Sequence, residues 1–79
     1  MRIRLRYFAA MREARGLDEE TRETSATNPR ELYQELRRCS LVHLDEQYLR
    51  PARNDAFCAW DEPLNEDDLV VFLSPFSGG

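Results

Sequence analysis

The residues best suited to chemistry are the last two, Gly78 and Gly79, which end the chain in a carboxylate carried by a peptide without side chains. Glycine has no Cβ, so such a tail can enter a narrow slot and adopt backbone angles closed to other residues. A carboxylate becomes a good electrophile only after one oxygen is made a leaving group, normally in an acyl-adenylate. The sequence contains no lysine and no phosphate-binding glycine loop, so we expect another protein to perform this activation.

Other side chains offer little catalytic chemistry. His43 is the only histidine, and no serine or cysteine nucleophile pattern accompanies it. The spacing of Cys39 and Cys58 matches neither a CxxC redox motif nor a paired metal-ligand motif. Both cysteines fall on predicted apolar faces, where we expect them to be buried and unreactive. The sequence therefore predicts no metal site and no bound cofactor.

The charged residues are predicted to lie on solvated surfaces. The adjacent carboxylates fall in predicted turns or on an edge strand: Glu19–Glu20, Asp61–Glu62 and Asp67–Asp68. Arginines at positions 2, 4 and 6 share one strand face, and we expect the glutamates at 19, 20 and 23 to pair with them across strands. The net charge of −4 and the pI of about 4.9 argue against nucleic acid or an anionic membrane as ligand and favour a basic partner protein.

Length and composition predict one globular domain. The chain has 79 residues, of which 42% are hydrophobic and 33% are charged, and this balance is typical of a folded domain. The N-terminal segment alternates arginine with apolar residues and has no apolar stretch typical of a signal peptide. We therefore expect a cytoplasmic protein that does not bind membranes.

Three elements are predicted in the first third of the chain. Residues 2–8 alternate, with Ile3, Leu5 and Tyr7 on one side and the arginines and Phe8 on the other, as in a half-buried strand. Residues 9–15 are predicted to form a short helix that ends at Gly16. Residues 19–25 are polar and threonine-rich, which indicates an edge strand antiparallel to the first.

The clearest boundary in the sequence is the start of the main helix. Asn28 is a favourable N-cap, proline follows at the first helical position, and Glu31 stands three residues after the cap. Apolar residues then recur at helical spacing on one stripe: Leu32, Leu36 and Cys39, with Tyr33 beside them. Residues 41–51 are predicted to form a loop or short helix that Pro51 closes.

The last third predicts two strands. Residues 55–61 alternate, and the flanking aspartates indicate that Phe57 points outward while Ala56, Cys58 and Trp60 point inward. The apolar run 69–73 is typical of a central strand covered on both faces, and we expect it to pair in parallel with the first strand. The predicted fold is an α+β mixed sheet packed on one main helix. Residues 1–74 would form the domain and 75–79 a flexible tail.

These features together resemble the ubiquitin-like β-grasp sulfur carriers, and among them most closely the small subunit of molybdopterin synthase. The resemblance covers nearly the whole chain. It rests on the strand 3–9 leading into residues 11–13, on Asn54 leading to Pro63–Leu64, and above all on the ending 68–79. The chain departs from the usual family pattern at three positions, which are Arg53 for an apolar residue, Asp67 for a turn glycine and Ser74 for a proline.

The resemblance implies a function for the tail. Gly79 would be adenylated by an activating enzyme of the ubiquitin-activating type that uses ATP, and then converted to a thiocarboxylate by a sulfur-donating enzyme. Gly79, preceded by Gly78, which also lacks a side chain, would enter the active site of the large synthase subunit in a heterotetramer. There it would donate sulfur to a pterin precursor in molybdenum cofactor biosynthesis. The residues that the resemblance assigns to partner binding are Phe8, Phe57, Leu73, Pro75 and Phe76.

Three other functions remain open from the sequence. The same sulfur chemistry serves thiamin, cysteine or thio-natural-product synthesis in related carriers. A protein modifier attached through Gly79 to lysines of target proteins is a second alternative, although without lysine it would not extend chains on itself. A plain interaction domain with an unused tail is the third.

Overall fold

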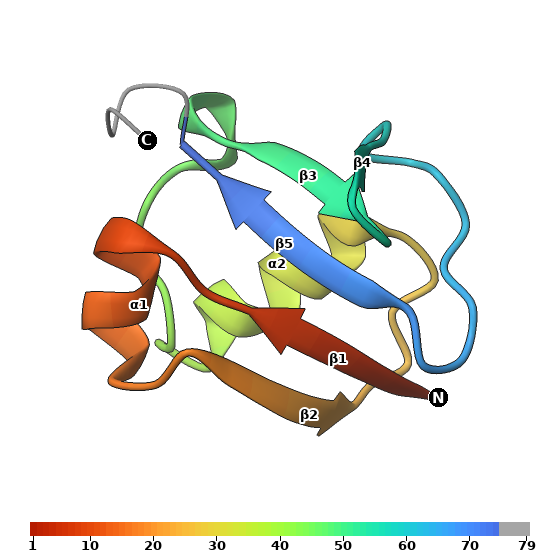
Figure 1. Cartoon of the computed structure of the whole chain (residues 1–79), viewed down its shortest axis with the longest axis horizontal. Coiled ribbons are helices and arrows are strands. Elements are labelled where there is room, and N and C mark those ends of the chain that lie inside the picture. Colours follow the sequence, from red (N-terminus) through yellow and green to blue (C-terminus); the bar gives the residue numbers. More distant parts are fainter. Residues whose placement is uncertain (75–79) are drawn as a thin grey trace.

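A mixed five-stranded sheet with one main helix across one face forms the body of the protein (Figure 1). The computed structural model describes residues 1–74, apart from the side chain of Ala10. The elements in chain order are β1 (Arg2–Arg6), α1 (Ala9–Arg15), β2 (Glu19–Glu23), α2 (Pro29–Arg38), the 3-10 turn η1 (Glu46–Tyr48), β3 (Arg50–Arg53), β4 (Ala56–Phe57) and β5 (Leu69–Leu73). The strand order is β2-β1-β5-β3-β4, with β5 parallel to β1 and all other pairs antiparallel. The α+β prediction is confirmed.

The N-terminal elements form as their sequence patterns predict. Ile3, Leu5 and Tyr7 are buried, and the intervening arginines face away from the core. Helix α1 ends at Gly16, whose φ of 74° lies in the left-handed region that glycine adopts without strain. Strand β2 pairs antiparallel with β1 at the edge of the sheet, as expected.

Helix α2 begins at its predicted cap. The Asn28 side chain accepts a hydrogen bond of 2.9 Å from the backbone N–H of Glu31, which satisfies one free donor of the first turn. Proline at the next position has no N–H to satisfy. The Glu31 carboxylate accepts from the backbone N–H of Thr27 at 2.7 Å and so ties the preceding loop to the helix.

The core lies between α2 and the sheet. Leu32, Tyr33 and Leu36 of the helix are completely buried against apolar residues of β1 and β5. The ring of Tyr33 lies 4.8 Å from that of Phe72, centroid to centroid, and Trp60 stacks on Phe72 at 5.8 Å. These ring contacts fix the helix against the central strand, because aromatic pairs favour such tilted and offset geometries.

Strand β5 is the central strand that its apolar sequence predicts. It lies between β1 and β3, and its pairing with β1 is parallel, with Leu5 opposite Val70. Val70 and Phe72 face the core under α2. Leu69 and Val71 alternate with them and lie on the opposite face, yet both are buried.

The structure corrects the prediction for residues 41–61. Strand β3 occupies Arg50–Arg53, where a loop ending at Pro51 was expected. Pro51 has no N–H to donate, but its carbonyl accepts from the N–H of Cys58 at 3.1 Å. The strand expected at 55–61 is only Ala56–Phe57. Ala56 lies on the face opposite Phe57 as predicted, but it is exposed. A central strand paired on both sides recruits this segment despite its weak β propensity.

The prediction that both cysteines are buried is also wrong. Helix α2 ends at Arg38, so Cys39 is the C-cap residue and is exposed instead of extending the apolar stripe. Cys58 follows β4 and is half-buried. Burial raises the pKa of the Cys58 thiol, and the nearby Glu62 carboxylate adds to this effect.

The expected ladder of ion pairs between β1 and β2 forms only in part. Arg6 pairs with Glu19 at 3.4 Å. Glu20 instead accepts hydrogen bonds from the Tyr7 hydroxyl and the Arg15 guanidinium on the inner side of the sheet. Burial of the Glu20 carboxylate disfavours its charge, but the two donors outweigh this effect and lower its pKa.

The acidic turn before β5 is a structured corner, not a solvated run. Asp68 is buried, and its carboxylate accepts from the N–H of Asn65 at 2.8 Å and the side-chain amide of Asn54 at 3.0 Å. Asp67 has a φ of 67°, a conformation that favours glycine. Its N–H donates to the carbonyl of Arg2 at 2.8 Å, and its carboxylate pairs with the guanidinium of that residue at 2.7 Å. Both bonds offset the backbone strain. The side-chain bond with Arg2 also lowers the pKa of the Asp67 carboxyl group.

Candidate functional site

The sheet face opposite α2 carries a patch of apolar residues, which we call the outer patch. Side chains that face each other across neighbouring strands share a face of the sheet, so the register identifies its members. Val71 pairs with Ala52, and Ala52 pairs in turn with Phe57, so these three form one row across β5, β3 and β4. Leu69 and Leu73 lie on the same face of β5, on either side of this row.

Two aromatic side chains that the sequence predicts to point outward are exposed, and one of them, Phe57, belongs to the outer patch. Phe57 is 58% exposed and Phe8, at the start of α1, is 48% exposed. The guanidinium of Arg50 lies 4.2 Å from the centre of the Phe57 ring, a cation–π contact that holds the ring in place. Large exposed apolar side chains such as these are typical of a protein interface.

Strand β5 is the last strand before the predicted reactive group, the carboxylate of Gly79. Leu73 is half-buried and is the last residue of the strand, and Ser74 is the last residue that the structure describes. Because β5 runs parallel to β1, both strands end at the same side of the sheet, close to α1 (Figure 1). Phe8 and Leu73 therefore lie at the end from which the tail leaves. The predicted site residues Pro75, Phe76, Gly78 and Gly79 lie outside the described residues.

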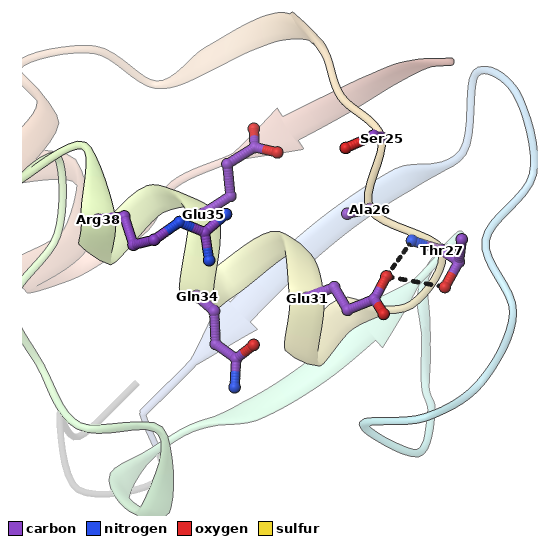
Figure 2. A pocket seen from close by; sticks show the side chains of 7 residues that line it. All are labelled: Ser25, Ala26, Thr27, Glu31, Gln34, Glu35 and Arg38. Carbon is purple, nitrogen blue, oxygen red and sulfur yellow. Dashed lines mark hydrogen bonds between the residues drawn. The ribbon is translucent and has the colours of Figure 1, made fainter.

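A hollow between α2 and the loop that precedes it is a structural feature instead of a second site. Its lining residues are Ser25, Ala26, Thr27, Glu31, Gln34, Glu35 and Arg38 (Figure 2). The Glu31 carboxylate is bonded to Thr27, as the dashed lines show. The Glu35 carboxylate accepts from Arg22 at 2.5 Å and from the Thr24 hydroxyl at 2.6 Å. Both carboxylates already serve the fold.

The described residues offer no other chemical centre. Within residues 1–74, no group of three histidine, cysteine or carboxylate side chains is placed to hold a metal ion. His43 is exposed on the loop after α2. No helix in the same range is long and apolar enough to cross a membrane.

The sequence prediction missed Arg50, which lies beside the outer patch. Its position follows from β3, a strand that the sequence pattern did not predict. One signal pointed to this strand. The run 69–73 is predicted to be a central strand, which needs a pairing strand along each of its two edges, and the sequence pattern assigns it only the first strand. Residues 50–53 lack the β-branched side chains that mark a strand.

The sheet order, the crossing helix and the exit of the chain from a central strand define a ubiquitin-like β-grasp domain. A family model described as the ThiS family matches residues 5–79. The chain belongs to the ThiS family, and its class is the ubiquitin-like sulfur carriers.

Solved structures support this fold. A putative molybdopterin converting factor subunit 1 from Pyrococcus furiosus is 27% identical, with a TM-score of 0.76 over 95% of this chain and 98% of that one. SAMP1 from Haloferax volcanii is 17% identical, with a TM-score of 0.77 over the whole of both chains. A complex of subunits 1 and 2 of the molybdopterin-converting factor from Helicobacter pylori contains a chain that is 22% identical, with a TM-score of 0.71 and full coverage of both. No curated protein matches the chain.

Proposed function

We propose that this protein is the small subunit of a molybdopterin synthase and donates sulfur from a thiocarboxylate on Gly79. One observation carries the proposal. The central strand β5 ends at the outer patch, which includes the exposed Phe57, and the sequence then continues to Gly-Gly. The likeness to a putative molybdopterin converting factor subunit 1 over nearly the whole chain supports it.

The chemistry takes place on the terminal carbonyl carbon. A carboxylate oxygen of Gly79 attacks the α-phosphate of ATP on the activating enzyme, and pyrophosphate leaves. Sulfide from a sulfur-donating enzyme then attacks the acyl carbon, and AMP leaves with the electron pair of the broken C–O bond. The product is a thiocarboxylate, whose sulfur is the group transferred to the pterin precursor. In this scheme the protein contributes the terminal carboxylate, and the activating and sulfur-donating enzymes supply the catalysis.

The outer patch is the surface that would hold the large subunit. Leu73 ends β5 on the outer face, Phe57 lies on the same face, and Phe8 is exposed shortly after β1, so docking over this surface would direct the tail into the active site of the partner. The tail residues Pro75 and Phe76 would contact the same partner. The complex of subunits 1 and 2 from Helicobacter pylori is a precedent for such a pair.

The central point can be tested by intact-mass measurement. The full chain is incubated with its activating enzyme, ATP and a sulfur source, and we expect the mass gain of one oxygen replaced by sulfur. A variant that lacks Gly79 should show no gain while keeping its thermal unfolding transition, because a terminal residue adds little to the core. No mass gain in the wild-type chain, with enzymes active on another carrier, would refute the proposal.

A second candidate function keeps the carrier chemistry and changes the sulfur acceptor. The match to the ThiS family model favours it, since that match identifies the carrier class and not the acceptor. Binding of a large synthase subunit separates the two, because a carrier for thiamin, cysteine or another thio-product would load sulfur but not bind that subunit. Gly79-dependent adducts on target proteins would instead indicate a protein modifier.

A further inference from the structure

We propose that the outer patch binds an acidic protein surface, in which carboxylates of the partner pair with Arg4 and Arg50 on either side of an apolar centre. The inference deepens the proposed function and rests on it only for the choice of partner. Within the described residues, the ion pairs of the chain leave two positively charged residues, Arg4 and Arg50, without an ion-pair partner on the outer face of the sheet.

Most arginines of this protein already have a carboxylate partner. Among the residues that the structure describes, the exceptions are Arg4, Arg38 and Arg50. Arg38 lies on α2 beside the Glu31 and Glu35 carboxylates of the hollow (Figure 2). Arg4 and Arg50 both lie on the outer face and are both exposed.

The two arginines border the outer patch from opposite sides. Arg4 pairs in register with Leu69, so it stands on β1 next to the central strand. Arg50 pairs with Leu73 on the other side of that strand and covers the Phe57 ring. The Nε of Arg4 donates to the carbonyl of Asp67 at 3.3 Å. The Asp67 carboxylate attracts this guanidinium from beyond ion-pair distance and pairs directly with Arg2 instead.

The carboxylates that share this face are already paired. Glu19 pairs with Arg6 at 3.4 Å, Glu23 with the N-terminal ammonium at 3.6 Å, and Asp67 with Arg2 at 2.7 Å. Among the strand residues of this face, Arg4 and Arg50 therefore have no carboxylate within ion-pair distance, although the chain as a whole is acidic. Fixed guanidiniums beside an apolar centre suit carboxylates, which they can bind with two parallel hydrogen bonds.

The same observations favour a protein over a nucleic acid. The apolar surface between the two arginines is offered by exposed Phe57 and half-buried Leu73, since Val71 and Ala52 of the row are buried. Such a surface suits apolar side chains better than a phosphate backbone. The net charge of −4 would repel a polyanion, whereas a partner with a local cluster of carboxylates meets the two arginines at short range.

The test is the affinity of the full chain for the purified large synthase subunit, measured by calorimetry at several salt concentrations. We expect Arg4→Gln and Arg50→Gln each to weaken binding about fivefold and to reduce its salt dependence. Arg50→Lys should restore only part of the affinity, because it keeps the charge but loses the planar fork that binds a carboxylate with two hydrogen bonds. Arg30→Gln, on the exposed side of α2, is the matched control and should bind as the wild type does.

Three results with the variants or with DNA would overturn the inference. They are unchanged affinity in both glutamine variants with a normal thermal transition, stronger binding in those variants, and binding of a 20-base-pair DNA duplex at physiological salt in place of the protein. A wild-type chain that does not bind the large subunit would also overturn it. Sulfur loading of Gly79 measured by intact mass is independent of these readouts, so failure of the carrier function would be seen separately.

Discussion

The two faces of the sheet differ in how their side chains are satisfied. On the inner face, α2 covers the core, and polar groups such as the Glu35 carboxylate find donors within the chain. Within the described residues, no buried side-chain nitrogen or oxygen lacks a hydrogen-bond partner. On the outer face, Phe57 is 58% exposed, and Arg4 and Arg50 have no carboxylate within ion-pair distance among those residues.

This difference shows which surface the chain completes by itself. Buried apolar groups with satisfied polar neighbours stabilise the fold, whereas exposed aromatic and unpaired charged groups add little to stability and are available to a partner. The inner face should therefore control unfolding, and the outer face should control binding. Each of the following predictions tests this separation.

The largest effect on stability is expected on the inner face. Leu36 is completely buried, so Leu36→Ala should lower the free energy of unfolding by about 2–5 kcal/mol through lost burial and a cavity. The matched change on the outer face, Phe57→Ala, should alter it by less than about 1 kcal/mol. Urea denaturation monitored by circular dichroism measures both. Equal losses would remove the distinction between the faces.

Binding should show the opposite order. Phe57→Asp places a charge in the outer patch and should weaken docking to the large subunit by at least about 2 kcal/mol, or roughly thirtyfold in Kd. Leu44→Asp changes another exposed apolar residue, on the loop after α2, and should leave Kd unaltered. Calorimetry at one salt concentration decides between them. If both variants bind equally well, Phe57 is no interface anchor.

The charged groups of the inner side should make stability depend on pH. Burial disfavours the charged form of Glu35, but hydrogen bonds from Thr24 and Arg22 outweigh it and place its pKa below the ordinary 4.5. A lowered native pKa means that this contribution is present above pH 4.5 and is lost as the pH falls through the native pKa. Acid should therefore destabilise the wild-type chain.

The variant Glu35→Gln isolates this contribution. At pH 7 it should lower the free energy of unfolding by about 1–3 kcal/mol, because the buried Thr24 hydroxyl and the half-buried Arg22 guanidinium lose a charged acceptor. The difference from wild type should shrink toward pH 3, where the wild-type carboxylate also becomes neutral. Glu13→Gln, on the exposed side of α1, is the control and should follow the wild-type profile. A difference that is independent of pH would contradict the assignment.

The smallest effect is expected at the helix cap. Asn28→Ala removes the hydrogen bond to the N–H of Glu31 and should cost about 1 kcal/mol, or about 4–8 °C in Tm for a domain of this size. Asn28→Asp keeps an acceptor oxygen at the cap and should restore most of the loss. Calorimetric scans of the three chains test this, and an unchanged Tm in the alanine variant would refute it. Docking through the outer face should be the same in all three.

Much of the fold could be predicted because it depends on neighbours close in sequence. Alternation placed β1 and the outward side of Phe57, the Asn28 cap placed the start of α2, and the apolar run placed β5 at the centre. The exposed Cys39 was mispredicted because helical spacing continued past the true end of the helix. A periodic pattern does not show where the last helical hydrogen bond forms.

The candidate site divides in the same way. The outward Phe8 and Phe57 are properties that the sequence determined by itself, because they follow from residue type and strand parity. Only the tertiary structure placed β3 beside β5 and thereby brought Arg50 next to Phe57 and Leu73. It also decided which arginines are paired, since ion pairs such as Arg2–Asp67 join residues far apart in the chain. Such pairs depend on the register of the whole sheet, which no local sequence pattern determines.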